Sequence, residues 1–99
     1  MKADYDSEAD ALSIDLIQVD RWDDGDSVDK DEQCNVAFSE GRVVNVELLY
    51  PAENLKLLKA AAERFELDAE GLLAAAKAAL AAPDRSVTLE LTGRLASSG

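Results

Sequence analysis

The chain has 99 residues, of which 47% are hydrophobic, and it carries a formal net charge of −11 with no histidine. This length predicts a single domain, residues 1–99, with a core of modest size. The missing histidine removes the commonest general base and the commonest metal ligand together. The lone cysteine, Cys34, excludes an internal disulfide and a thiolate metal cluster.

The charge is unevenly spread along the chain. Before Tyr50 the acidic residues far outnumber the basic ones, whereas from Pro51 onward the two nearly balance. The acidic half would repel phosphates, so nucleic acid is not an expected partner, but it suits a basic protein or cations. No apolar run reaches the ~18 residues of a membrane span, and the first residues lack the layout of a secretory signal. We expect a cytoplasmic protein with no membrane partner and no cofactor.

Residues 2–50 predict a four-stranded β portion. Lys2 to Tyr5 is a short strand, and Asp6 to Asp10 is a turn, because Asp side chains accept hydrogen bonds from nearby backbone N–H groups. From Ala11 to Asp20 apolar and polar residues alternate, which is typical of a half-buried strand. The apolar phase shifts after Leu16, so we expect a β-bulge there.

Residues 21–32 are too acidic to pack well and predict a loop. Within it, Trp22 is expected to cover an edge of the core, with a pocket or a partner surface as the alternatives. Residues 33–38 and 43–49 alternate again, and Gly41 in the connection favours a tight hairpin turn.

The second half predicts a two-helix hairpin over residues 51–82. Pro51 suits a first helical turn, and Asp68 is a good N-cap for the second helix. The second helix is rich in alanine, so it can lie close to a sheet or another helix, and it is our candidate surface for self-association. Residues 86–92 predict a fifth strand, and residues 93–99 a frayed tail.

These elements predict an α+β fold: an antiparallel sheet of two β-hairpins plus a fifth strand, with the helix hairpin packed on one face. The other face of the sheet is expected to be either wet or an interface. Its predicted residues are Ser13, Asp15, Asn45 and Glu47.

Three segments resemble the YuzE-like family of small bacterial proteins of unknown function. They are Tyr5-Asp6-Ser7-Glu8-Ala9-Asp10-Ala11-Leu12-Ser13-Ile14, Asn35-Val36-Ala37-Phe38 and Gly41-Arg42-Val43-Val44-Asn45-Val46-Glu47-Leu48-Leu49. The resemblance covers residues 2 to about 50 and implies an antiparallel sheet of two hairpins. It implies no catalytic residue. Relatives are suspected to sit beside small toxin-like proteins, which implies an antitoxin-like role.

Several groups of residues could form chemical sites. The turn carboxylates Asp6, Glu8 and Asp10 could form a cation site or an acid/base pair, but turn capping explains them better. The acids of residues 23–31 do not fit an EF-hand loop. Residues 57–80 can be laid on a helix-turn-helix, yet the second helix offers only Lys77 as a base, which favours a packing role. Cys34 is expected to be a buried, inert thiol.

Three functions follow, in falling order of preference. The first is a non-catalytic acidic interaction or regulatory module, a homodimer whose acidic surface meets a basic protein; its sharpest form is antitoxin-like. The second is a small-molecule binder or small enzyme with a pocket between sheet and helices. The third is a DNA-binding regulator. For the second function, the candidate pocket residues are Trp22, Tyr5, Tyr50 and Phe65, and the candidate catalytic carboxylates are Asp6, Asp10, Asp15 and Glu47.

Overall fold

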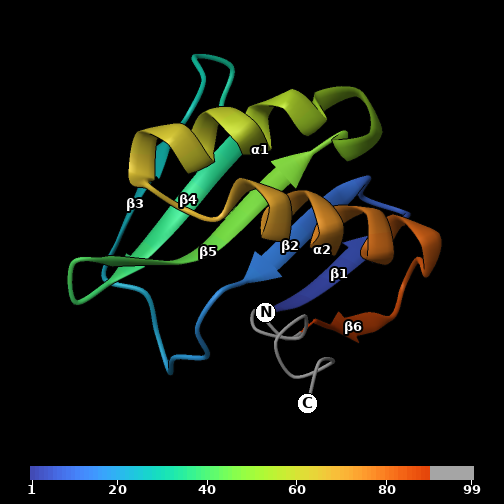
Figure 1. Cartoon of the computed structure of the whole chain (residues 1–99), viewed down its shortest axis with the longest axis horizontal. Coiled ribbons are helices and arrows are strands. Elements are labelled where there is room, and N and C mark those ends of the chain that lie inside the picture. The colour runs from blue at the N-terminus through green and yellow to red at the C-terminus, as the bar shows by residue number, and fades with distance from the viewer. Residues whose placement is uncertain (90–99) are drawn as a thin grey trace.

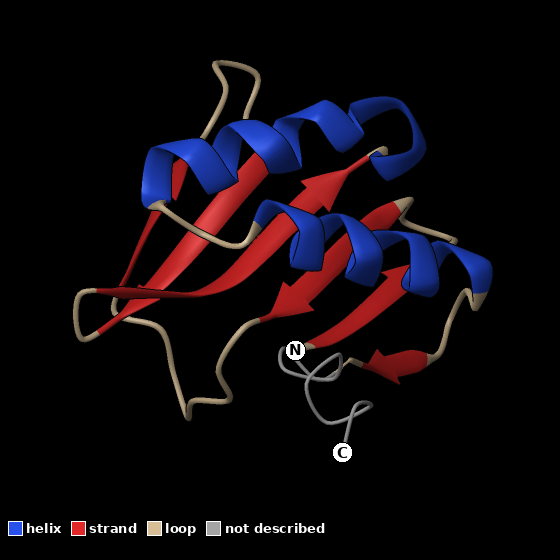
Figure 2. Ribbon diagram, in the orientation of Figure 1, coloured by secondary structure: helices blue, strands red, loops and turns tan. Residues whose placement is uncertain are grey.

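Six strands form one antiparallel sheet, and two helices lie across one of its faces (Figures 1 and 2). The α+β prediction is therefore confirmed. The structure, a computed structural model, describes residues 1–89. Its strands are β1 (Lys2–Asp6), β2 (Ala11–Asp15), β3 (Asp24–Ser27), β4 (Cys34–Ser39), β5 (Arg42–Leu49) and β6 (Ser86–Thr88), and its helices are α1 (Pro51–Phe65) and α2 (Ala69–Ala81).

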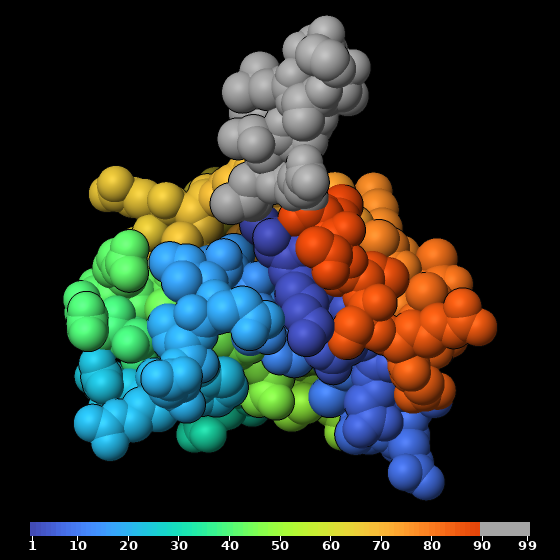
Figure 3. All heavy atoms as spheres, turned by 90° about the horizontal axis from the view of Figure 1, so that it is seen from below, coloured from blue at the N-terminus to red at the C-terminus, as the bar shows by residue number. Residues whose placement is uncertain are grey.

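The strands lie in the order β3-β4-β5-β2-β1-β6. The hairpins β1–β2 and β4–β5 are joined side by side by pairing between β2 and β5. After the helices the chain returns to the far edge, where β6 pairs with β1. Two hydrogen bonds between Met1 and Leu89 extend this contact. The Met1 ammonium donates to the Leu89 carbonyl at 2.8 Å, and the Leu89 N–H donates to the Met1 carbonyl at 2.7 Å. Figure 3 shows the resulting neighbourhood of the first and last described segments.

The structure corrects the predicted strands in two places. Residues 24–27, expected in a loop, form β3 at the edge of the sheet. The strand expected over residues 11–20 ends at Asp15; beyond it the N–H groups of Leu16 and Ile17 both donate to the Val44 carbonyl, at 2.8 and 3.3 Å. Leu16 and Ile17 thus both oppose Val44, which is the arrangement of a β-bulge, so the bulge expected after Leu16 is found there. A further irregularity in pairing falls between β4 and β5, at Ala37 and Phe38. The fifth predicted strand is described over 86–88; its residues 90–92 and the predicted tail lie outside the described residues.

The helix hairpin is confirmed, with a cap at the end of α1 and another at the start of α2. Pro51 opens α1, and Glu66 closes it in a left-handed conformation (φ 58°) with its N–H on the Ala62 carbonyl. The Asp68 carboxylate then caps α2 by accepting from the Gly71 N–H at 3.1 Å. Among residues 1–89 the structure contains no helix with the length and apolar character needed to cross a membrane.

The core fills the space between the sheet and the helices. Alternate residues of the strands point toward the helices, and fully burying each leucine there is worth about 1.5–3 kcal/mol. Ala75, Ala76 and Ala79 of α2 lie in this core, so part of the surface expected for self-association is used inside the molecule, where small side chains let α2 approach the sheet closely. Ala74 and Ala81 remain exposed. The main buried residues are Ala3, Leu12, Ile14, Cys34, Val36, Val46, Leu48, Leu58, Ala61, Ala62, Leu72, Ala75, Ala76 and Ala79.

Cys34 begins β4 and is fully buried in this core. Burial, with a smaller contribution from the nearby Asp29 carboxylate, raises the pKa of the Cys34 thiol to about 12. Because the thiolate is the reactive form, the native protein at pH 8 should react with an aromatic disulfide reagent only as fast as it unfolds. The same reagent in urea should react at once. Rapid labelling of the native protein would contradict the burial.

Candidate functional site

The face of the sheet opposite the helices is polar. The strand register places Asp4, Ser13, Glu47, Asn35 and Ser27 in one row across it. A second row is Lys2, Asp15, Asn45, Ala37 and Gly25. The four residues predicted to share this face therefore do so, since side chains alternate between the two sides of a strand.

A groove of about 550 Å³ runs over this face across β3, β4 and β5. Trp22 stands on its rim with 56% of its surface exposed, so the prediction that it covers the core edge is wrong. Asn45 and Glu47 line the groove from β5, and Ala37 lines it from β4. The groove thus combines an aromatic side chain, amide groups and carboxylates on the side of the sheet that the helices leave uncovered.

Asn45 is the one polar residue of the described chain that is buried, with 2% of its surface exposed. Its amide nitrogen donates to the Ser13 hydroxyl at 2.9 Å and to the Asp15 carboxylate at 2.8 Å. Both amide hydrogens are used in this way, because an asparagine side chain has two. The amide therefore ties β5 to β2 on the uncovered face, and it fixes the orientation of the Asp15 carboxylate beside the groove.

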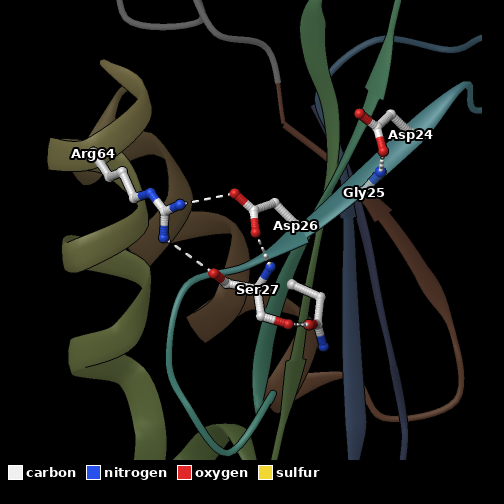
Figure 4. A network of polar contacts seen from close by, with 6 residues as sticks. Asp24, Gly25, Asp26, Ser27 and Arg64 are labelled. Carbon is white, nitrogen blue, oxygen red and sulfur yellow. Dashed lines mark hydrogen bonds and ion pairs between the residues drawn. The ribbon is translucent and has the colours of Figure 1, made fainter.

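The edge strand β3 has its own polar network (Figure 4). The Asp24 carboxylate accepts from the Gly25 N–H, and the Asp26 carboxylate accepts from the Ser27 N–H, each at 2.8 Å. Arg64 of α1 donates to the Ser27 carbonyl at 3.0 Å and pairs with Asp26 at 2.7 Å. These contacts occupy two N–H groups and one carbonyl of β3 that could otherwise pair with another strand, and such contacts help to protect a sheet edge.

The carboxylates of the first turn serve its geometry. Asp6 accepts from the N–H groups of Glu8 and Ala9, at 3.0 and 3.2 Å. Asp10, in a left-handed conformation (φ 53°), accepts from the Tyr5 hydroxyl at 2.6 Å. Within residues 1–89 no three acidic or cysteine side chains are arranged to hold a metal ion. The turn-capping interpretation of Asp6 thus accounts for its contacts.

Replacing Asp6 and Asp10 together with alanine should lower the free energy of unfolding by about 1–3 kcal/mol, because the turn then loses hydrogen bonds to backbone and tyrosine groups. Urea denaturation followed by circular dichroism measures this. The matched control is Asp20→Ala, an exposed acid in the segment after β2, which should change stability by less than about 0.5 kcal/mol. An unchanged double variant would show that these carboxylates do not support the turn.

A second contact holds this turn to the C-terminal half. The Asp84 carboxylate accepts from the Ser7 N–H at 2.9 Å and from the Ser7 hydroxyl at 2.7 Å. Its own N–H donates to the Tyr5 carbonyl at 2.7 Å. The hydrogen bonds from Ser7 hold the pKa of the Asp84 carboxyl below its ordinary value of 3.8. The sequence signalled only a turn at Asp84, because the partner lies 77 positions away.

Because the pKa of Asp84 is lowered in the folded chain, the direction in which stability changes with pH can be predicted. A carboxyl that is more acidic in the folded chain stabilises the fold above its ordinary pKa, and the contribution is lost as pH falls through the folded value. Asp84→Asn should therefore be less stable than the parent at neutral pH and should show a shallower loss of stability as the pH falls below about 4. Thermal melting across that range checks this, and parallel curves would contradict it.

The four predicted pocket residues are not brought together. Phe65 packs edge-to-face on Phe38 on the helix side, with ring centroids 5.6 Å apart, whereas Trp22 borders the groove on the opposite face. The Tyr5 hydroxyl is bound to Asp10, and Tyr50 is 47% exposed at the start of α1. Of the candidate carboxylates, Asp15 and Glu47 share the uncovered face, while Asp6 and Asp10 belong to the turn.

Comparison with protein-family models, with curated proteins and with solved structures finds no match to this chain.

Proposed function

We propose that this protein is a non-catalytic acidic interaction module that binds a basic partner protein through the uncovered face of its sheet. The groove beside Trp22 carries this proposal. It offers an exposed aromatic side chain among carboxylates, the combination that a basic protein surface complements. The net charge of −11 would also steer a basic partner toward the molecule over a distance of about a Debye length.

Self-association is the second element of the proposal, and it would use a different surface. Two copies placed face to face would bring two surfaces that each carry Asp15 and Glu47 together, which is unfavourable between like charges. We infer that a homodimer would leave the groove accessible. Light scattering measures the oligomeric state directly.

We further propose membership of the YuzE-like family and, as the sharpest form of the function, an antitoxin-like role toward a small basic protein. The motif segments of residues 5–14, 35–38 and 41–49 support this, and they fall on β1, β2, β4 and β5. A cytoplasmic location is part of the same proposal.

The enzyme alternative ranks second because the residues nominated for its pocket lie on two faces of the sheet. The DNA-binding alternative ranks last because α2 has one basic residue, Lys77.

The test is affinity capture from native lysate with the full chain. A specific basic protein should be retained at about 0.1 M salt and released at about 1 M, where the Debye length falls from about 10 to about 3 Å. Glu47→Lys, which reverses a charge on the uncovered face, should weaken capture about tenfold, a loss of about 1.4 kcal/mol.

The matched control is Glu53→Lys, which makes the same exchange at an exposed position of α1 on the covered side of the molecule. It should capture as the parent does. Equal loss in both variants would indicate a general charge effect. Recovery of the self-associated chain alone would overturn the proposed function.

A further inference from the structure

Many hydrogen-bond donors of the polar groups that line the groove are already bonded to acceptors within the protein. The Ser27 hydroxyl donates to the Asn35 side-chain oxygen at 2.6 Å, and the Asn35 amide donates to the Glu32 carbonyl at 2.9 Å. The backbone N–H groups of Gly25 and Ser27 are bound to the carboxylates that precede them. The groove therefore offers a ligand mainly hydrogen-bond acceptors.

Asn45 provides an acceptor at the floor of the groove that the protein itself does not use. No hydrogen bond among residues 1–89 involves its side-chain oxygen, while both of its amide hydrogens are donated to Ser13 and Asp15. Since no fully buried side-chain polar atom in that part of the chain lacks a partner, this oxygen keeps some contact with solvent although the residue is 2% exposed, and Asn45 is one of the residues that line the groove. A nearly buried amide that keeps one open acceptor suits a ligand that donates.

Around this acceptor the groove brings together two further features. Glu47 projects an exposed carboxylate from the neighbouring row of the same strand, and no hydrogen bond of the described residues involves it. Trp22 lines the same groove and is more than half exposed. Carboxylates favour a cation with several donors, and tryptophan is the best side chain for holding a cation over a ring.

We propose that the groove is a recognition site for an arginine side chain of the partner, with the guanidinium stacked on Trp22 and its N–H groups directed to Glu47 and the Asn45 side-chain oxygen. Arginine fits better than lysine for two reasons. Its planar group has donors on several nitrogens and can reach a carboxylate and an amide oxygen together. It also stacks on an aromatic face, whereas the compact ammonium is strongly hydrated.

This inference rests on the proposed function, since it names the side chain by which the basic partner is read. Trp22 is the only tryptophan in the chain, so its fluorescence reports on the groove alone. The experiment titrates the full-length protein with two blocked tripeptides of equal charge, Gly-Arg-Gly and Gly-Lys-Gly. The arginine peptide should shift the emission saturably and bind at least about fivefold more tightly than the lysine peptide.

Glu47→Gln keeps the shape of the side chain and removes its charge, and it should weaken the arginine peptide about fivefold or more. Glu53→Gln is the matched control and should leave the titration unchanged. Trp22→Ala, followed by calorimetry, should remove the preference for arginine over lysine. Circular dichroism of each variant establishes that it is folded before binding is compared.

The outcomes separate this inference from the proposed function. Equal binding of the two peptides, or an arginine affinity untouched by Glu47→Gln, would overturn arginine recognition. The salt-sensitive capture of a basic protein would then stand by itself. Arginine binding with the expected variant effects, but no captured basic protein, would overturn the proposed function and leave a groove that binds the side chain alone.

Discussion

The antiparallel pairing of β2 with β5 is the interaction on which the rest of the structure depends. Its register places Leu12 opposite Leu48 on the helix side and Ser13 opposite Glu47 on the other side. Because side chains alternate, a slip of one residue would send the apolar set to water and the polar set into the core. The same register therefore creates the core and the polar face that carries the groove.

One-sided packing explains where a partner would bind. The helices bury one face of the sheet, and the opposite face keeps its carboxylates in contact with solvent. At the β3 edge, Asp24 and Asp26 occupy backbone N–H groups and Arg64 occupies a carbonyl. Strand addition at that edge would first have to break these contacts, so side-chain recognition on the uncovered face is the better-supported mode.

The acidic residues of the first half divide into two groups with different roles. Asp6 and Asp10 are engaged by the turn, and Asp84 reaches across to hold that turn from the C-terminal side. Asp23, Asp24 and Asp26 beside Trp22 are likewise held by backbone N–H groups. Glu47 makes no side-chain hydrogen bond among residues 1–89 and lies exposed in the lining of the groove. Composition alone could not distinguish the hydrogen-bonded acidic residues from the exposed ones, because the fold determines which carboxylates have hydrogen-bond donors within reach.

The sequence by itself determined the local elements: alternation marked β2, β4, β5 and the shared polar face. Pro51 in the first turn of α1 and the N-cap Asp68 of α2 marked the starts of the helices. Such patterns are readable because they reflect hydrogen bonding and burial over a few residues. Only the tertiary structure decided the strand order, the strand at residues 24–27 and the position of Trp22 over the groove. Strand β3 has no apolar alternation of its own, and it exists because β4 offers a backbone edge to pair with. The groove likewise depends on contacts between residues far apart in the chain, which no local pattern encodes.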